Sequence, residues 1–141
     1  RATAGPIVGD KNCFKLHYLA PNIWAAGCGT AADCDHVTEM IKRDLQLHRL
    51  NTGSDTRVMT AVTKFSSHLF NYMGHIGAGI ILGGIDVNGP QVWSIDPHGY
   101  TMALPFHTQG SGSVAAMAVL ENDYREENGE VVMEEQGTID L

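Results

Sequence analysis

Polar and apolar residues alternate over residues 13–19, which places every second side chain on the same side of an extended chain. A period of two sustained over seven residues predicts a β-strand. The dipeptide Pro21-Asn22 predicts a turn, and the apolar run 23–26 that follows predicts a second strand. Because the connection is so short, we expect the two strands to pair as an antiparallel hairpin.

Helical spacing of apolar residues begins next and continues for about forty residues. Val37, Ile41 and Leu45 predict one face of a helix over 30–50, and a second apolar stripe predicts another helix over 56–72. Glycine at position 53 ends the first of these patterns. Two consecutive helices of this kind suggest an antiparallel pair that lies across a sheet.

Strand patterns return after Gly74. Residues 77–86 are apolar on both faces, which predicts a central strand, and turn residues separate it from further strands over 91–96 and 101–108. A short helix is predicted over 114–124. The order of elements is β-β-α-α-β-β-β-α with hairpin connections, which indicates the α+β class.

The two ends of the chain carry weaker signals. Residues 1–10 are small and turn-rich, and residues 126–137 are acidic without a sustained apolar stripe, so we expect a loop or disorder there. The chain begins without methionine and ends on the apolar Leu141. We therefore expect a single domain over 1–141 that is cut at both ends.

Composition narrows the classes of function. The 141 residues carry a formal charge of −7, which argues against nucleic acid as a main partner. No apolar run approaches the roughly 20 residues of a membrane span, so we expect no membrane partner. Three cysteines without a CxxC spacing favour free thiols over a disulfide framework or a zinc site. We expect no metal and no cofactor.

Candidate chemistry starts where the second strand runs into the first helix. Gly27-Cys28-Gly29 predicts a turn, with Thr30 as the N-cap of the helix. Free N–H groups at a helix N-terminus can hold a phosphate, a carboxylate or a developing oxyanion. Residues 27–32 and 110–115 both match G-x-G-x-x-A, but a second helix follows the first one, so the dinucleotide fingerprint is weak. Close packing of a helix on a sheet explains the glycines equally well.

Several side chains have both a functional and an ordinary interpretation. Lys15 lies within the first predicted strand: on a buried face it becomes a proton carrier or a fixed charge, whereas on an open face it is an ordinary lysine. Asp33, Asp35 and His36 suit a metal, but acids in a first helical turn commonly stabilise the helix dipole. Ser111 lies between glycines, yet the surrounding GSGS is not the G-x-S-x-G of a serine hydrolase.

A set of short motifs, in order along residues 1–125, resembles a proteasome beta subunit, and the trypsin-like class is the most similar. The motifs are Arg1-Ala2-Thr3, Asp10-Lys11-Asn12-Cys13, Gly27-x-Gly29-Thr30-Ala31-Ala32-Asp33, Leu45-x-Leu47-His48-x-Leu50-x-Thr52-Gly53, Leu82-Gly83-Gly84-Ile85-Asp86-Val87, Pro97-His98-Gly99 and Gly110-Ser111-Gly112-Ser113-x-Ala115-Ala116-Met117-Ala118-Val119.

The resemblance implies a threonine peptidase with an N-terminal nucleophile, built as an αββα four-layer sandwich that is incomplete in this chain. It implies other proteasome alpha and beta subunits as partners, unfolded polypeptide as substrate, and a location in cytoplasm and nucleus. It requires no cofactor.

The resemblance also assigns site residues. Lys15 matches the lysine that lowers the pKa near the nucleophile, Gly29 the oxyanion donor, and Ser111 a serine near the terminal amine. Other residues match substrate-binding positions or lie beside them, and the two acids suit a basic side chain: Ala2, Thr3, Cys13, His17, Gly27, Ala31, Asp33 and Asp35.

One departure from the family pattern changes the expected activity. The family nucleophile is a threonine about eighteen residues before the Arg-Ala-Thr motif, which here stands at residues 1–3, and Thr3 is not at the matching position. We therefore expect the chain as written to be inactive, with three alternatives. In the first alternative, the chain is a non-catalytic structural subunit. In the second, it is a nonproductive truncated product in which the strands 13–19 and 77–86 have unpaired edges. In the third, it is part of an ordinary active subunit.

Overall fold

A computed structural model of the chain describes residues 1–127 and 130–131. They group into two compact units, Arg1–His107 and the part of the chain from Thr108 onward, and each is described here by itself. The prediction of one domain over 1–141 stays a prediction.

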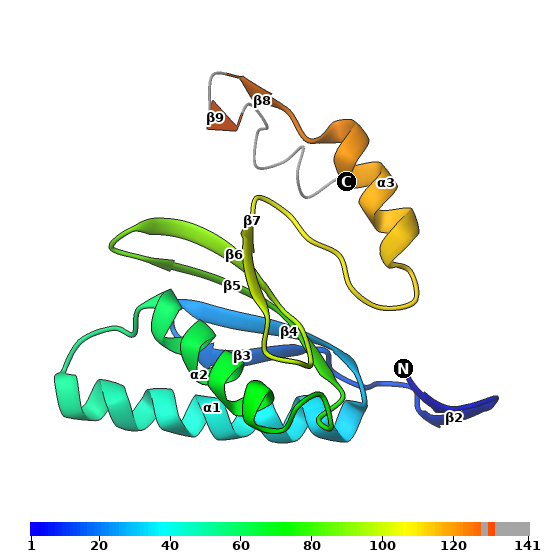
Figure 1. Cartoon of the computed structure of the whole chain (residues 1–141), viewed down its shortest axis with the longest axis horizontal. Coiled ribbons are helices and arrows are strands. Elements are labelled where there is room, and N and C mark those ends of the chain that lie inside the picture. Colours follow the sequence, from blue (N-terminus) through cyan, green and yellow to red (C-terminus); the bar gives the residue numbers. More distant parts are fainter. Residues whose placement is uncertain (128–129, 132–141) are drawn as a thin grey trace. The chain divides into compact units, whose positions relative to one another are not determined.

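The first unit contains a five-stranded antiparallel sheet in the order β3-β4-β5-β6-β7 (Figure 1). Strands that are adjacent in the sheet are also consecutive along the chain. Hairpins and the helix pair therefore make all the connections. The bounds are Leu16–Ala20 for β3, Ile23–Gly29 for β4, Ala78–Asp86 for β5, Gly89–Ile95 for β6 and Thr101–Leu104 for β7.

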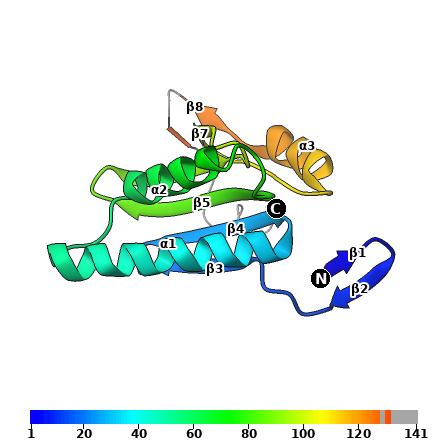
Figure 2. The same cartoon turned by 60° about the horizontal axis from the view of Figure 1, so that its bottom comes forward.

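Two helices cover one face of this sheet, α1 over Ala31–Thr52 and α2 over Val58–Asn71 (Figure 2). Helix α1 packs on β3, β4 and β5, whereas α2 packs on β5 and β6. The buried core lies between the two layers, because both helices turn their apolar stripes towards the sheet. Its largest fully buried side chains include Phe65, Ile23, Ile41, Leu45, Leu69, Ile80, Leu82 and Ile95.

Strand β5 is the central strand, as its apolar sequence predicts. It pairs with β4 on one side and with β6 on the other. The expectation of an unpaired edge on residues 77–86 is therefore wrong, whereas β3 does stand at an edge of the sheet. At Gly84 a Cβ atom would lie 2.9 Å from the Asn22 carbonyl oxygen and 2.9 Å from Val58 Cγ2, so glycine allows α2 to approach the sheet closely.

A hairpin at the start of the chain was not predicted. Residues Ala2–Ala4 form β1 and Ile7–Asp10 form β2, which pair only with each other. Every residue of β2 is exposed. Figure 2 shows this hairpin apart from α1 and the five-stranded sheet, joined to them by residues 11–15.

The second unit contains α3 over Ser113–Asp123 and two short paired strands, β8 at Glu126–Glu127 and β9 at Glu130–Val131. The helix confirms the prediction over 114–124. These two strands lie inside the region predicted as loop or disorder, and the rest of 126–137 lies outside the described residues. Within the described part of the chain, no helix has the length and apolarity needed to cross a membrane.

The α+β class is confirmed. The described residues of Arg1–His107 build one helix layer on one sheet, which supplies two layers of the four that the resemblance implies. Both helices and all five strands of the sheet lie where the sequence predicts them, with shifted ends. The first predicted strand starts at Leu16 rather than at residue 13, and the second runs to Gly29 rather than ending at residue 26.

Candidate functional site

The residues Gly27-Cys28-Gly29 form the last part of β4, and the turn predicted there is wrong. Gly29 still pairs with Ala78 of β5 and has a φ of +108°. A Cβ atom at this position would collide with the carbonyl oxygen of Gly77. Only glycine fits, because both the positive φ and the adjacent carbonyl exclude a side chain.

Two hydrogen bonds fasten the start of α1 to the start of β5. The Thr30 N–H donates to the Gly77 carbonyl over 2.7 Å, and the Gly77 N–H donates to a carboxylate oxygen of Asp33 over 2.8 Å. Thr30 is the N-cap residue, as predicted, but its side chain makes no capping bond. Asp33 therefore holds Gly77 at the N-terminal end of the helix, where a negative charge is favourable.

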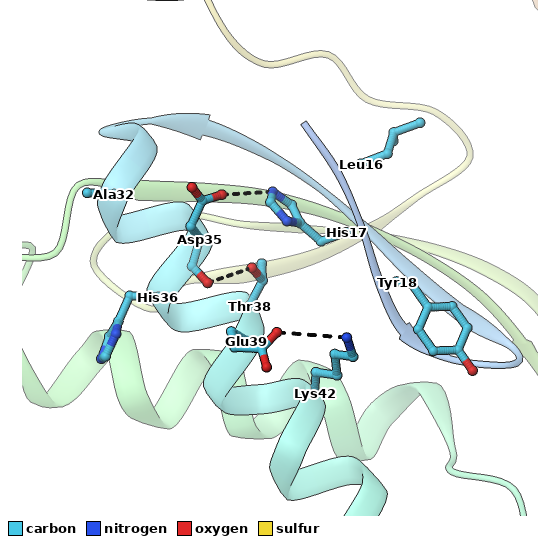
Figure 3. A pocket seen from close by; sticks show the side chains of 9 residues that line it. All are labelled: Leu16, His17, Tyr18, Ala32, Asp35, His36, Thr38, Glu39 and Lys42. Atoms are coloured by element: carbon cyan, nitrogen blue, oxygen red, sulfur yellow. Dashed lines mark hydrogen bonds and ion pairs between the residues drawn. The ribbon is translucent and has the colours of Figure 1, made fainter. Parts of the chain in front are cut away.

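A pocket of about 630 Å³ opens between β3 and the first half of α1. Figure 3 shows its lining, in which the His17 ring points from β3 towards the Asp35 carboxylate on α1. His17 Nε2 lies 3.9 Å from Asp35 Oδ1. The His17 side chain is only 16% exposed and that of Asp35 is 68% exposed. The carboxylate therefore faces solvent at the pocket while the imidazole forms part of its wall.

Gly27 lies against this wall. A Cβ atom there would be 3.6 Å from His17 Nε2 and 3.0 Å from the Cβ of Cys34. The absence of a side chain at Gly27 lets the imidazole and the buried Cys34 approach the same point of β4. Three of the predicted substrate-binding residues, His17, Gly27 and Asp35, are thus brought together.

Lys15 lies directly before β3, so the prediction that placed it inside the strand is wrong. Its carbonyl oxygen accepts a 3.0 Å hydrogen bond from the Gly27 N–H, which extends the pairing of β3 with β4 by one residue. Lys15 is exposed. Its ammonium nevertheless acts on the thiol of Cys28, the residue before Gly29: burial raises the pKa of that thiol, and the positive charge of Lys15 opposes this increase.

Burial dominates the titration of the neighbouring cysteines. It raises the pKa of the Cys28 thiol, and the ammonium of Lys15 offsets only part of this increase. Cys34 is buried and its Sγ atom lies 3.3 Å from the Cys28 carbonyl oxygen. Burial first, then the nearby thiol of Cys28 and carboxylate of Asp35, raise the pKa of Cys34 to about 11. A thiol with such a pKa is a poor nucleophile at neutral pH.

The remaining predicted site residues lie elsewhere. Ala2 and Thr3 belong to β1, in the separate two-stranded sheet, and Thr3 is exposed. Ala31 is the exposed first residue of α1. Cys13 is half-buried, and its thiol lies 3.7 Å from the Phe14 carbonyl oxygen. Ser111 lies in the turn before α3, in the second unit.

Part of the pocket was missed by the sequence reasoning. A stripe along α1 contributes Ala32, Glu39 and Lys42 in addition to Asp35, and β3 contributes Tyr18. Residues spaced by three, four and three positions share one side of a helix. The spacing from residue 32 to residue 42 could have revealed this stripe, had the position of β3 beside it been known.

Metal binding finds no support in the part of the chain that the structure describes. No group of three or more histidine, cysteine, aspartate or glutamate side chains is placed there to hold an ion. Asp33, offered as a candidate metal ligand, accepts the Gly77 N–H, and Asp35 faces His17.

Over most of its length the chain is similar to known proteins. The family model described as "Proteasome subunit" matches residues 1–136. The chain is 57% identical over 126 residues to "Proteasome subunit beta type-7-A" of Arabidopsis thaliana, a match that covers 89% of this chain and 46% of that protein. It is 49% identical over 127 residues to "Proteasome subunit beta type-2" of Saccharomyces cerevisiae, covering 90% and 49% of the two chains. It is 46% identical over 125 residues to "Proteasome subunit beta type-10" of Rattus norvegicus, covering 89% and 46%.

The chain thus spans about half the length of the curated relatives that it matches. The matched family model nevertheless extends over almost all of its residues. The chain therefore belongs to the proteasome subunit family, among its beta subunits.

Proposed function

We propose that this chain supplies the substrate-binding and charge-stabilising side of a threonine-peptidase site of the trypsin-like class. The observation that carries the proposal is the pocket in which Asp35 presents a solvent-facing carboxylate beside His17 and Gly27. A carboxylate in such a pocket attracts a lysine or arginine side chain of a polypeptide and disfavours an acidic one.

Gly29 is proposed as the oxyanion donor. Its backbone lies two residues beyond Gly27, at the end of β4 and just before the N-terminus of α1. The contacts of Thr30 and Asp33 with Gly77 fix the backbone at this point. A donor that is already held in place stabilises the charge of a tetrahedral intermediate without reorganisation during the reaction. The exposed ammonium of Lys15 adds positive charge near this end of the strand, since it acts on Cys28.

We also propose that the 141 residues by themselves hydrolyse no peptide bond. Among the described residues near Gly29, the thiol of Cys34 is buried with a raised pKa, and burial raises the pKa of Cys28 as well. Thr3 lies on the separate hairpin. Preorganised donors without an activated nucleophile retain only a small part of the rate.

Assembly and location complete the proposal. We propose other proteasome alpha and beta subunits as partners, unfolded polypeptide as substrate, and a location in cytoplasm and nucleus. These proposals rest on family membership and on the names of the relatives, which are proteasome subunits.

Because the 141 residues are proposed to lack an activated nucleophile, the test uses them joined to an upstream segment that begins with the threonine nucleophile and assembled with their proteasome partners. Two fluorogenic peptides are the substrates, one with arginine and one with leucine before the scissile bond. Asp35→Asn should lower kcat/KM for the arginine peptide by about tenfold and leave the leucine peptide unchanged, because one charge–charge contact is lost. Asp55→Asn is the control, since Asp55 pairs with Arg49 at the far end of α1. Equal losses for both peptides, or none, would refute the assignment of the pocket.

A structural role without catalysis is the second candidate. It is favoured by the continuous buried core of the first unit, to which both helices and the strands beneath them contribute. Urea unfolding of the 141-residue chain separates this role from a nonproductive fragment, because only a folded layer gives a cooperative transition.

A further inference from the structure

The Asp35 carboxylate in the pocket already has a neighbour, His17, that can compete with a ligand for its negative charge. His17 Nε2 lies 3.9 Å from Asp35 Oδ1 and belongs to a largely buried side chain that forms part of the pocket wall. Imidazole is the side chain whose charge changes between about pH 5 and pH 8. When protonated, His17 forms an ion pair with Asp35. When neutral, it leaves the carboxylate uncompensated.

The other charges of the pocket do not take over this role. Glu39 is matched by Lys42 at 3.8 Å and by Arg43 at 3.2 Å. Lys42 also lies over the Tyr18 ring, at 6.0 Å from its centroid. These contacts hold the cation of Lys42 one helical turn or more beyond Asp35.

The elements packed against His17 add few titratable groups. None of the β4 residues paired with β3 titrates; they are Ala26, Ala25, Trp24 and Ile23. From α1 the buried thiol of Cys34 lies beneath the imidazole, at Gly27. His36 lines the pocket too, but Figure 3 shows it on the other side of the helix from the His17 ring. Lys15, two residues before His17, is exposed, and its ammonium acts on the thiol of Cys28, the residue after Gly27.

We propose that His17 sets the specificity of this pocket. The neutral imidazole leaves the Asp35 carboxylate open to a basic side chain of the ligand, whereas the protonated imidazole pairs with that carboxylate instead. The inference rests on the proposed function, since it assumes that Asp35 receives the basic side chain. Two unit charges about 4 Å apart in water change an affinity by about fivefold. We expect a change of this size for a basic ligand between acid and mildly alkaline pH.

The experiment measures binding rather than turnover, with the 141-residue chain. Nα-acetyl-arginine amide is titrated at constant ionic strength and followed by the ¹H–¹⁵N NMR shifts of Asp35 and its neighbours, at about pH 5.5 and about pH 8. Nα-acetyl-citrulline amide is the neutral probe of the same shape. The variants are Asp35→Asn, His17→Gln and, as the matched control histidine, His36→Gln. The dispersion of each amide spectrum checks folding, and His17→Asn replaces His17→Gln should that variant not fold.

Wild type should bind the arginine probe about fivefold more tightly at the higher pH, and the citrulline probe equally at both. His17→Gln should bind arginine at both pH values as wild type does at the higher one, whereas His36→Gln should keep the dependence. Binding is reciprocal with protonation, so adding the arginine probe at the lower pH should reduce the protonated fraction of His17.

The two hypotheses fail in different ways. If Asp35→Asn binds arginine as well as wild type does, or if wild type does not bind it at either pH, the proposed function of the pocket is wrong. If Asp35 is required but His17→Gln keeps the pH dependence, only the role of His17 is wrong.

Discussion

The backbone at Gly29 is the most constrained point of the site. Two separate factors exclude a side chain there, the φ of +108° and the collision of a Cβ atom with the Gly77 carbonyl oxygen. That carbonyl accepts the Thr30 N–H, so it cannot move away without releasing the start of α1. The proposed oxyanion donor therefore depends on a contact between two glycines from distant parts of the sequence.

Gly29→Ala should reduce the free energy of unfolding by about 3 kcal/mol or more, as strain in φ and overlap with a fixed carbonyl add together. Gly53→Ala is the control that separates the two factors. Gly53 has a φ of +69° at the end of α1, and nothing lies within 4 Å of its added Cβ atom. The Gly53→Ala variant should lose only about 1 kcal/mol of its free energy of unfolding. Equal losses in urea unfolding would show that the contact with Gly77 contributes nothing.

The sequence predicted which candidate residues lie together better than it predicted their surroundings, and their role in substrate binding stays a prediction. His17, Gly27 and Asp35 do meet, as the resemblance implies, although 18 positions separate the first from the last. The exposure of Lys15 could not be predicted, because alternation places a side chain on a face without showing what covers that face. Similarly, the sequence suggested Asp33 as a pocket residue, and only the structure shows that its carboxylate accepts a hydrogen bond from the Gly77 N–H.

At the scale of elements, the helices and the strands of the main sheet were predicted, whereas the two short hairpins at the ends of the chain were not. The two helices and β5 carry apolar patterns that tertiary packing then uses. The β1–β2 hairpin is mostly exposed, so backbone pairing alone defines it and no apolar pattern reveals it. Glycines at positions 27 and 29 suggested a turn, but here they allow Cys34 and Gly77 to approach a continuous strand.

Helix α2 has an N-terminal cap that comes from a distant strand. Its N-cap residue, Arg57, makes no side-chain capping bond, and its first turn contains no acidic residue. Instead Asp86, at the end of β5, accepts the Val58 N–H over 2.9 Å. The backbone N–H groups of Asn88 and Val58, in that order, are the main reason that the pKa of the Asp86 carboxyl lies below its usual value.

Asp86→Asn should lower the midpoint of urea unfolding at neutral pH. A carboxyl with a lowered pKa in the folded state stabilises the protein above its unfolded-state pKa, and this contribution disappears as the pH falls through the folded-state pKa. The difference between wild type and variant should therefore be largest above about pH 5 and vanish in acid.

Asp96→Asn is the matched control. Asp96 accepts the His98 N–H two residues on, as Asp86 accepts that of Asn88, but the bonds found for it are with its own turn. Asp96→Asn should therefore change the midpoint of urea unfolding less than Asp86→Asn does. A difference between wild type and Asp86→Asn that stays constant with pH would show that charge at the helix end is not the cause.

At the scale of the whole chain, burial is unevenly distributed among the described residues. All the buried apolar side chains found there lie between Leu19 and Ile95, within the first unit. Helix α2 contributes five buried residues, whereas α3 contributes none. A helix of 11 residues without a buried face has little to stabilise it, because isolated helices of this length are marginal in water.

Amide hydrogen exchange of the intact chain should therefore separate α2 from α3. We expect the interior amides of α3 to exchange at least about 100-fold faster than those of α2, since local opening costs little where few apolar contacts are lost. Phe65→Ala removes a fully buried ring from α2 and should destabilise the first unit by about 3–5 kcal/mol. It should accelerate exchange in α2 and β5 and leave the rates in α3 unchanged. Protection of α3 equal to that of α2, or a joint loss in the variant, would mean that the two units unfold together.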